Sequence, residues 1–248
     1  MRRVRYALFL GVISLLLVLS GCHPSSRIER QLRTIRFSGY EWIVKSSTER
    51  VGPGPNLFSD DNVWVDDNGW LHLKVSNKNG QWSCAEVISS RRFGYGTYVF
   101  KLASRVDHLD PNIVAGLFTW HPGRSLHNRE LDIEFSRWGK SAGPNVVYVV
   151  QPAEQHGHKH EFNLVQRDLH TTHIIRWSRR EISFSSYEGY STGIPSGPAI
   201  QSWTYRGVFK PRPRNIQARI NLWLFGGRTP VFPHETELLI REFAYIPY

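Results

Sequence analysis

Cysteine is scarce in this chain, which has two among its 248 residues. Cys22 follows an uncharged stretch from Tyr6 to Ser20, and Cys84 stands alone further along. Two cysteines cannot form the several cross-links on which small secreted scaffolds depend. If Cys22 is modified, Cys84 has no partner within the chain, and we expect it to be a small buried hydrophobe rather than half of a disulfide.

Phosphate-binding glycine loops and Cys-x-x-Cys pairs are absent from the sequence. Their absence removes the main support for a nucleotide enzyme or a zinc enzyme. Three histidines alternate at His156, His158 and His160, but such a loop is more often solvated than metal-bound, so we predict no metal site there. We expect no cofactor.

The chain also lacks an apolar run long enough to cross a bilayer comfortably, because the stretch that ends at Ser20 falls short of the roughly 20 residues needed. It follows MRRVR and precedes Leu19-Ser20-Gly21-Cys22, an order typical of an export signal. The last four residues resemble the bacterial lipoprotein signal, in which the cysteine is lipidated and becomes the new N-terminus. We therefore predict a signal peptide over 1–21, with an ordinary cleaved signal as the alternative.

Lipidation would attach the protein to a membrane through acyl chains on Cys22. His23 stands where that resemblance associates an aspartate with retention at the inner membrane. The prediction is therefore a lipid-anchored protein of the bacterial cell envelope, held at the outer membrane. Residues 22–36 are polar and basic without periodicity, which predicts a tether ahead of a single domain over 37–248.

Acidic residues are fewer than basic ones, with 21 Asp and Glu against 31 Lys and Arg and a formal charge of +10. Removing 1–21 takes away three arginines and no acid, which leaves +7. The basic residues are scattered, and an exported lipoprotein meets little nucleic acid. The excess therefore favours a surface beside anionic lipid or an acidic glycan over nucleic-acid binding. We expect a monomer.

Stretches with helical periodicity are lacking as well, whereas short alternating runs rich in Val, Ile, Phe, Tyr and Trp recur throughout. Such runs, separated by turn residues, predict an all-β, two-sheet antiparallel sandwich or jelly roll. The segment 190–215 is proline-rich and without pattern, and it is predicted to be a long loop. The predicted strands are 71–75, 84–89, 98–102, 113–120, 130–135, 146–150, 172–177, 181–185, 218–225 and 238–243.

The run from Glu130 to Phe135 alternates acids with hydrophobes. On a strand, residues two apart point to the same side, so Glu130, Asp132 and Glu134 share one face. Acids are poor strand formers and three neighbouring like charges repel, so stability alone does not explain the pattern. A solvent-facing strand is one interpretation. The other is glycoside hydrolysis, which needs paired carboxyl groups; a bound cation such as calcium is a weaker third interpretation.

This run resembles the E-x-D-x-E strand signature of glycoside hydrolase family 16, in the form found in bacterial lichenases. Three further segments resemble that family's C-G-E with Y-G-Y-G-x-[YF], I-V-x-x-x-F-T-Y and N-L-W stretches, in family order. They are Cys84-Ala85-Glu86 with 93–98, Ile113-Val114 with 118–123, and Asn221-Leu222-Trp223. The similarity extends over about 60–246 and implies a concanavalin A-like jelly roll with a concave substrate cleft.

The resemblance implies that Glu130 is a nucleophile, Asp132 its assistant and Glu134 the general acid and base. It also implies that five residues line a sugar-binding cleft, namely Glu86, Trp120, Tyr148, Asn221 and Trp223. Without the resemblance, the preferred interpretation is that Trp120 and Trp223 belong to the core, Tyr148 caps a strand and Glu86 is an exposed strand acid. The expected activity is retaining, endo-acting cleavage of a β-linked polysaccharide, and β-glucan is the first candidate substrate.

Two positions depart from the lichenase pattern. Ile88 stands where lichenases have a substrate-contacting arginine, and Asn128 stands near the place of a tryptophan. These are binding positions, so the resemblance leaves the sugar and the linkage open. Transglycosylation by the same chemistry, or a non-catalytic carbohydrate-binding lipoprotein on the same fold, are the alternatives.

Overall fold

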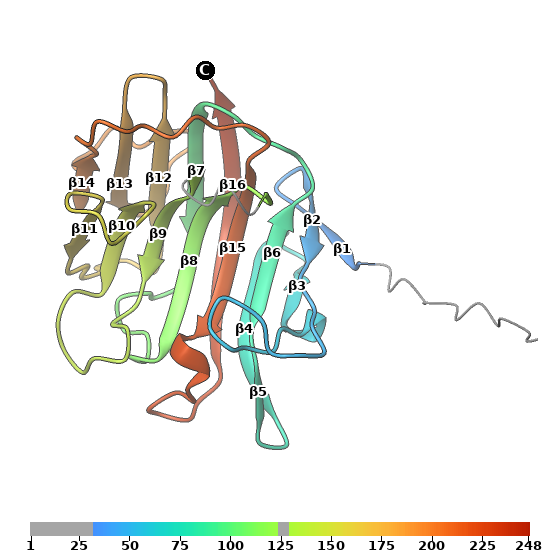
Figure 1. Cartoon of the computed structure of the whole chain (residues 1–248). Coiled ribbons are helices and arrows are strands. Elements are labelled where there is room, and N and C mark those ends of the chain that lie inside the picture. Colours follow the sequence, from blue (N-terminus) through green and yellow to red (C-terminus); the bar gives the residue numbers. More distant parts are fainter. Residues whose placement is uncertain (1–31, 124–128) are drawn as a thin grey trace, which may run out of the picture. The chain divides into compact units, whose positions relative to one another are not determined.

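The computed structural model describes residues 32–123 and 129–248, and strands dominate this part of the chain (Figure 1). Its strands are β1 (Thr34–Phe37), β2 (Tyr40–Val44), β3 (Val63–Val65), β4 (Leu71–Lys78), β5 (Gln81–Ser83), β6 (Ala85–Ser89), β7 (Gly96–Leu102), β8 (Ile113–Trp120), β9 (Leu131–Phe135), β10 (Val146–Val150), β11 (Lys159–Phe162), β12 (Thr171–Trp177), β13 (Ile182–Glu188), β14 (Gln201–Thr204), β15 (Gln217–Leu224) and β16 (Thr236–Pro247). Two short 3-10 turns accompany them, η1 (Asp60–Asn62) and η3 (Phe225–Gly227).

The strands form two antiparallel sheets that pack face to face (Figure 1). The first sheet has the order β1-β2-β6-β15-β8-β9-β10-β11, and the second has the order β14-β13-β12-β7-β16-β4-β3, with β5 paired to β4. The arrangement is a two-sheet sandwich, as the sequence predicts. We call the first sheet the cleft sheet, because its outer face carries the candidate site described below.

The core lies between the sheets and follows from the alternation within each strand. On β9, Leu131, Ile133 and Phe135 are fully buried against the second sheet, and Asp132 and Glu134 point the other way. The second sheet contributes large side chains such as Phe100 and Trp177. Each fully buried Leu, Ile or Phe contributes roughly 1.5–3 kcal/mol, so the apolar half of β9 helps to stabilise a strand whose other half is acidic.

Most predicted strands are present, some longer than expected, and the turn at Ser178 joins β12 to β13 as an antiparallel hairpin. Two boundaries differ from the prediction. The proposed tether extends too far, because β1 begins at Thr34 and pairs with β2. The predicted loop over 190–215 contains β14, which adds an edge strand to β13. Cys84 is fully buried and free, as expected, and burial raises its pKa to about 12.

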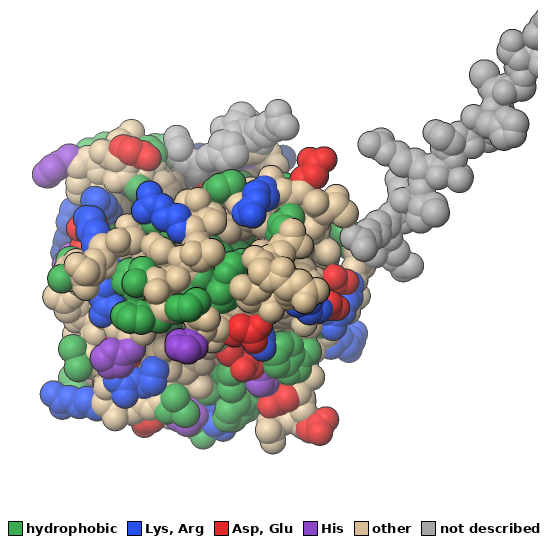
Figure 2. Space-filling model, turned by 90° about the horizontal axis from the view of Figure 1, so that it is seen from below, with side chains coloured by type: hydrophobic (Ala, Val, Ile, Leu, Met, Phe, Trp, Pro, Cys, Tyr) green, Lys and Arg blue, Asp and Glu red, His purple; other side chains and the backbone are tan. Residues whose placement is uncertain are grey.

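The two ends of the sandwich differ in their charges. Figure 2 looks at the end where β15 finishes and shows acidic and basic side chains interspersed, with exposed hydrophobic ones among them. Ion pairs such as Lys78–Asp61, Lys74–Glu235 and Arg105–Asp107 belong to this end. Within the described residues, no helix is long and apolar enough to cross a membrane.

Candidate active site

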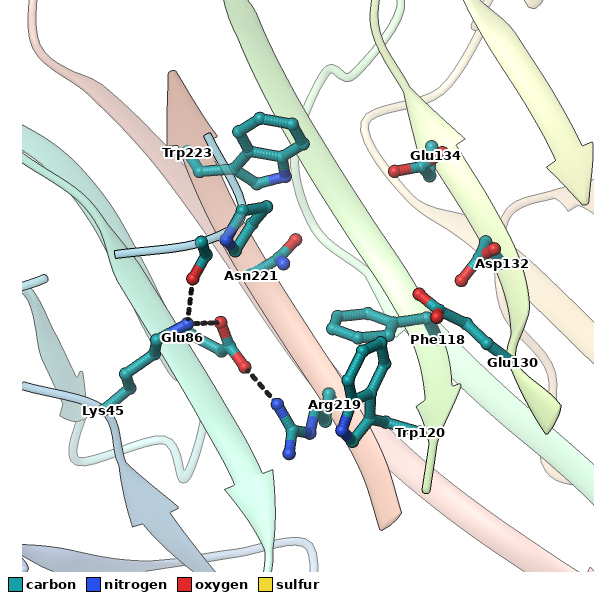
Figure 3. Close-up of a pocket in the computed structure, with 12 residues that line it drawn as sticks. Lys45, Glu86, Phe118, Trp120, Glu130, Asp132, Glu134, Arg219, Asn221 and Trp223 are labelled. Atoms are coloured by element: carbon teal, nitrogen blue, oxygen red, sulfur yellow. Dashed lines mark hydrogen bonds and ion pairs between the residues drawn. The ribbon is translucent and has the colours of Figure 1, made fainter. Parts of the chain in front are cut away.

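Strand β9 presents the three predicted acids to one cavity. Glu130 immediately precedes the strand, and Asp132 and Glu134 follow on the face turned away from the core. Figure 3 shows all three carboxyl groups on the cavity side of β9. Thr119 of β8 fixes the start of the strand, because its hydroxyl accepts a hydrogen bond from the Leu131 amide at 3.0 Å.

The register of the cleft sheet places partners for these acids in rows. One row runs from Glu86 on β6 through Asn221 on β15 and Gly116 on β8 to Glu134 on β9. Gly116 leaves room in that row, because a Cβ atom there would lie 2.5 Å from Asn221 Oδ1. The missing side chain opens the floor of the cavity between the amide and the carboxyl group.

The neighbouring row runs from Ile88 through Arg219 and Phe118 to Asp132. Arg219 therefore lies directly across from Ile88. Its guanidinium lies 5.2 Å from the Trp120 ring centroid and lines the same cavity.

Glu86 sits at the foot of the cavity between two cations. It is 1% exposed, and its two oxygens accept hydrogen bonds from Lys45 Nζ at 2.7 Å and Arg219 Nη1 at 3.0 Å. Figure 3 draws both contacts. A buried carboxylate is tolerated when it is paired in this way, and the pairing holds Arg219 in the cavity.

The environment of the three acids favours their protonated forms. Burial raises the pKa of Glu130 to about 8, with a smaller increase from the charge of Glu134, while Asp132 and Arg219 act in the opposite direction. Burial also raises the pKa of Asp132, helped by the charge of Glu130, and the pKa of Glu134, helped by the charge of Asp132. The trio therefore holds protons above the pH at which free carboxyl groups lose them.

The carboxyl groups of Glu130 and Asp132 influence each other beyond the effect of burial, because Asp132 lowers the pKa of Glu130 while the charge of Glu130 raises the pKa of Asp132. Two carboxyl groups can share a hydrogen bond only when one of them carries a proton, since ionised carboxylates are acceptors only. Gln151 Nε2 donates to Asp132 at 2.9 Å. Asp132 is 2% exposed, and the bond from Gln151 fixes its carboxyl group within the trio.

A loop from Val51 to Asn56 walls the cavity on the side away from β9. Lys45 Nζ donates to the Gly52 carbonyl at 2.6 Å, and Gly52 and Pro53 line the cavity. The Asn56 amide donates to the carbonyls of Pro53 and Leu224, both at 2.8 Å. The loop is tied at both ends and gives the cavity a fixed edge.

A second hollow continues the cavity beyond the acids. Glu134 and Trp223 line both hollows, whose volumes are about 320 and 460 Å³. The second hollow extends over β10 and β11, where it is lined by Val147 and Lys159 among others. The acids therefore lie within a groove that crosses the sheet and has room on both sides of them.

Of the five residues predicted to line the cleft, Glu86, Trp120, Asn221 and Trp223 do line it. The prediction for Tyr148 is wrong. Tyr148 is fully buried on the core side of β10, where its hydroxyl lies 2.6 Å from the Ser186 hydroxyl. Its register partner Ile133 faces the core, so strand alternation puts both side chains between the sheets.

Sequence reasoning did not assign Gly52 and Pro53 to the site, and it also missed the side chains of Lys45, Phe118, Gln151 and Arg219. Alternation offered a signal for Arg219, two residues before Asn221, and for Phe118, two residues before Trp120. Lys45 and Gln151 lie at strand ends and reach the site only through tertiary contacts. Cys22, the signal peptide and Asn128 fall outside the described residues.

The histidines at 156, 158 and 160 do not converge. The buried His158 ring contacts the Val150 carbonyl at 2.9 Å and the Tyr205 hydroxyl at 2.8 Å, whereas His160 Nε2 lies 2.8 Å from the Gln201 amide. Among the described side chains, no group of three or more His, Cys, Asp or Glu residues is arranged to hold a metal ion.

Fold and site together define a jelly-roll sandwich with a carboxylate-lined groove across one sheet. Solved structures share this fold. A Bacillus licheniformis β-glucanase is 17% identical, with a TM-score of 0.60 over 84% of this chain and 92% of its own. A β-1,3-1,4-glucanase (lichenase) from a mouse hindgut metagenome is 19% identical, with a TM-score of 0.60 over 84% and 93%.

A third similar structure is a Bacteroides ovatus mixed-linkage-glucan protein of glycoside hydrolase family 16, in complex with its product. It is 11% identical, with a TM-score of 0.61 over 83% of this chain and 94% of its own. No family model and no curated protein sequence matches the chain. The structural likeness confirms the predicted fold, a jelly roll of the kind that these glucanases have.

Proposed function

We propose that this protein is a retaining, endo-acting glycoside hydrolase that cleaves a β-linked polysaccharide, with β-glucan as the first candidate. The observation that carries the proposal is the position of Glu130, Asp132 and Glu134, which line one groove on the outer face of the cleft sheet. Their common burial and mutual repulsion cost stability, so a chemical role accounts for them better than a structural one.

Glu134 fits the general acid. Burial and the charge of Asp132 raise its pKa, so it keeps a proton to give to the departing glycosidic oxygen. Once the leaving group has gone, the same carboxylate can take a proton from the incoming water.

Glu130 fits the nucleophile, which must be ionised to attack the anomeric carbon. Burial raises its pKa, while the interaction with Asp132 and then the charge of Arg219 lower it. Retention requires two carboxyl groups about 5–5.5 Å apart, whereas residues four apart on a strand are separated by roughly 13 Å at the backbone. A double displacement therefore requires the two carboxyl groups to lean toward each other over Asp132.

The groove suits a polymer that is cut internally. Space on both sides of Glu134 accommodates sugars before and after the scissile bond. Trp120 and Trp223 offer aromatic faces for the C–H faces of pyranose rings, and Asn221 offers an amide for their hydroxyls. Arg219, directly across from Ile88, can replace the arginine that the lichenase resemblance leads one to expect at that position.

Glu130→Gln tests the proposal with little change in shape. Reducing ends released from mixed-linkage glucan and laminarin should fall about a thousandfold or more, while the melting temperature does not fall. Wild-type activity in this variant would contradict the assignment. Proton NMR of the first product should show the β anomer, because two successive displacements retain configuration.

Two other outcomes would point elsewhere. Binding of these glucans without cleavage by the wild-type protein would favour a non-catalytic carbohydrate-binding role. Longer oligosaccharides formed at the expense of hydrolysis products would favour a transglycosylase.

Export and lipidation at Cys22 remain proposals from the sequence. The protein made in a Gram-negative host should carry diacylglycerol on Cys22 and fractionate with the outer membrane. Cys22→Ala should abolish the mass shift and the membrane association. Wild-type protein of unmodified mass in the soluble periplasmic fraction would support an ordinary signal peptide instead.

A further inference from the structure

One end of the sandwich is strongly basic. We call it the basic end: it is the end at which β6, β8, β12 and β14 finish and β9 and β15 begin, at the top of Figure 1. The register brings the loops of these strands together, since Phe93 bridges Ile216 and Gln217 pairs with Trp120. The loops carry Arg91, Arg92, Arg129, Arg179, Arg180, Arg206, Lys210, Arg212 and Arg214.

These charges lack the partners found at the opposite end. Within the described ranges, none of the nine basic residues forms an ion pair, whereas Lys74, Lys78 and Arg105 at the other end all do. The acids of the basic end are few, such as Glu41 and Glu181. Residues 189–234 contain six Lys and Arg and no Asp or Glu.

The positive charges of this end also act on His121, which follows the cavity-lining Trp120. Burial lowers the pKa of His121, and the charges of Arg129, Arg92 and Arg214 lower it further. These three guanidinium groups, from three different loops, therefore act on one place.

The loop between β14 and β15 adds an exposed apolar tip to this surface. Val208 is 103% exposed and Phe209 is 54% exposed. Arg206 precedes them, and Lys210, Arg212 and Arg214 follow. A large apolar pair in water costs free energy without gain unless something covers it.

The base of the loop is held firmly, so the tip projects. Tyr205 is buried, and its hydroxyl lies 2.8 Å from His158 Nε2. Trp177 Nε1 donates to the Pro211 carbonyl at 2.9 Å. These contacts anchor the chain on both sides of Val208 and Phe209, and the exposed pair is therefore a fixed feature of the fold.

We propose that the basic end docks on an anionic lipid surface, with Val208 and Phe209 entering the interface between headgroups and acyl chains. Apolar side chains flanked by Lys and Arg are the composition that binds such interfaces. A soluble acidic glycan would pair with the arginines but would gain little from the apolar tip. The contact needs neither the Cys22 lipid nor catalysis by Glu130.

The chain offers a matched control for the tip. Val231 and Phe232 are also adjacent, 57% and 66% exposed, but they lie at the opposite end, where the Phe232 amide donates to Asp110. Val208→Ser/Phe209→Ser should weaken partitioning of the full-length protein onto phosphatidylglycerol/phosphatidylcholine vesicles about tenfold. Val231→Ser/Phe232→Ser should leave it unchanged, with melting temperatures checked for both.

The charges are tested on the same vesicles. Replacing Arg206, Lys210, Arg212 and Arg214 with Gln should weaken binding about fivefold for each residue removed, and raising the salt concentration should weaken binding of the parent protein. Vesicles of phosphatidylcholine alone should show neither effect. Equal binding by the parent and by the tip and charge variants, together with no response of a probe placed at position 208, would overturn the proposal.

A local probe covers the case in which the N-terminal segment alone holds every variant on the vesicles. In a Cys22→Ser background, a polarity-sensitive fluorophore on Val208→Cys should shift to the blue and be quenched by lipid-borne quenchers, and one on Val231→Cys should not. The buried Cys84 should stay unlabelled. The absence of a fluorescence shift at position 208 would contradict insertion of the tip into lipid. Charge-dependent binding to dextran sulfate that the tip substitutions do not change would instead identify a soluble polyanion as the ligand of the basic end.

Discussion

Gly116→Ala is the sharpest test of the geometry of the groove. The added methyl group would lie 2.5 Å from Asn221 Oδ1 and 3.6 Å from Phe118 Cδ1. The first distance is far below van der Waals contact, and Asn221 stands between Gly116 and Glu86 in the same row. Overpacking of this kind typically costs about 1–3 kcal/mol, and in a domain of this size each kcal/mol lowers the melting temperature by roughly 2–4 °C.

The variant should also lose activity, because the displaced amide is the group proposed to bind a sugar hydroxyl. We expect kcat/KM on the preferred glucan to fall at least about tenfold, the value of one hydrogen bond to substrate. Gly197→Ala is the control, since a Cβ atom there meets no atom within 4 Å. It should change neither stability nor activity.

Asn221→Ala, added to Gly116→Ala, separates the loss of stability from the loss of activity. Among the described residues, Asn221 Oδ1 is buried without a hydrogen-bond partner, so truncating the side chain removes the clash and strands no other group. Stability should recover by a coupling energy of about 0.5–3 kcal/mol, while activity stays low. The reasoning is refuted if Gly116→Ala matches the parent in melting temperature and kcat/KM, or if the second substitution restores activity.

Three further outcomes are expected. Glu134→Gln should lower kcat/KM on polysaccharide about 10²–10⁴-fold but spare kcat/KM on aryl glycosides whose leaving group needs no proton, because kcat/KM reports only the first displacement. Equal losses of kcat/KM on both substrates would remove its role as acid. Tyr148→Phe should cost about 1 kcal/mol by chemical denaturation, because the Ser186 contact is lost, and leave kcat/KM unchanged. The melting temperature should fall between pH 6.5 and 8, and fall less in Glu130→Gln; parallel curves would contradict the raised pKa of Glu130.

Alternation along single strands carried most of what the sequence could predict. It placed Leu131, Ile133 and Phe135 in the core and the three acids opposite them, and the structure agrees. Such reasoning needs only the period of two residues that the extended backbone imposes. The same reasoning extends to a neighbouring strand once the pairing register of the two strands is known.

Tyr148 shows where that reasoning fails. Val146, Tyr148 and Val150 form a run that is apolar on both faces, since Val147 and Val149 are apolar too, so alternation alone assigns neither face. The face is decided by pairing, with Tyr148 opposite Ile133. A residue carried over from a resemblance therefore needs its register as well as its sequence position.

Arg219 shows a different limit. Its face follows from the alternation with Asn221 and Trp223, but its role depends on Glu86, which lies 133 positions away in sequence. Lys45 completes the same cluster from a third segment. Ion clusters assembled from distant segments have no sequence signature of their own, and only the topology of the sheet reveals them.

The pH dependence of stability follows from the carboxyl trio and one buried histidine. Folding raises the pKa of Glu130 from 4.5 to about 8, so between these values the folded state binds a proton that the unfolded state has lost, and stability falls as pH rises by up to about 1.4 kcal/mol per pH unit. Burial lowers the pKa of His173 from 6.5 to about 3, so its contribution is lost as pH falls through that window. The two slopes oppose each other between pH 4.5 and 6.5, and above 6.5 the carboxyl groups alone act. The groove therefore destabilises the fold most in the pH range where an ionised Glu130 would be ready to attack.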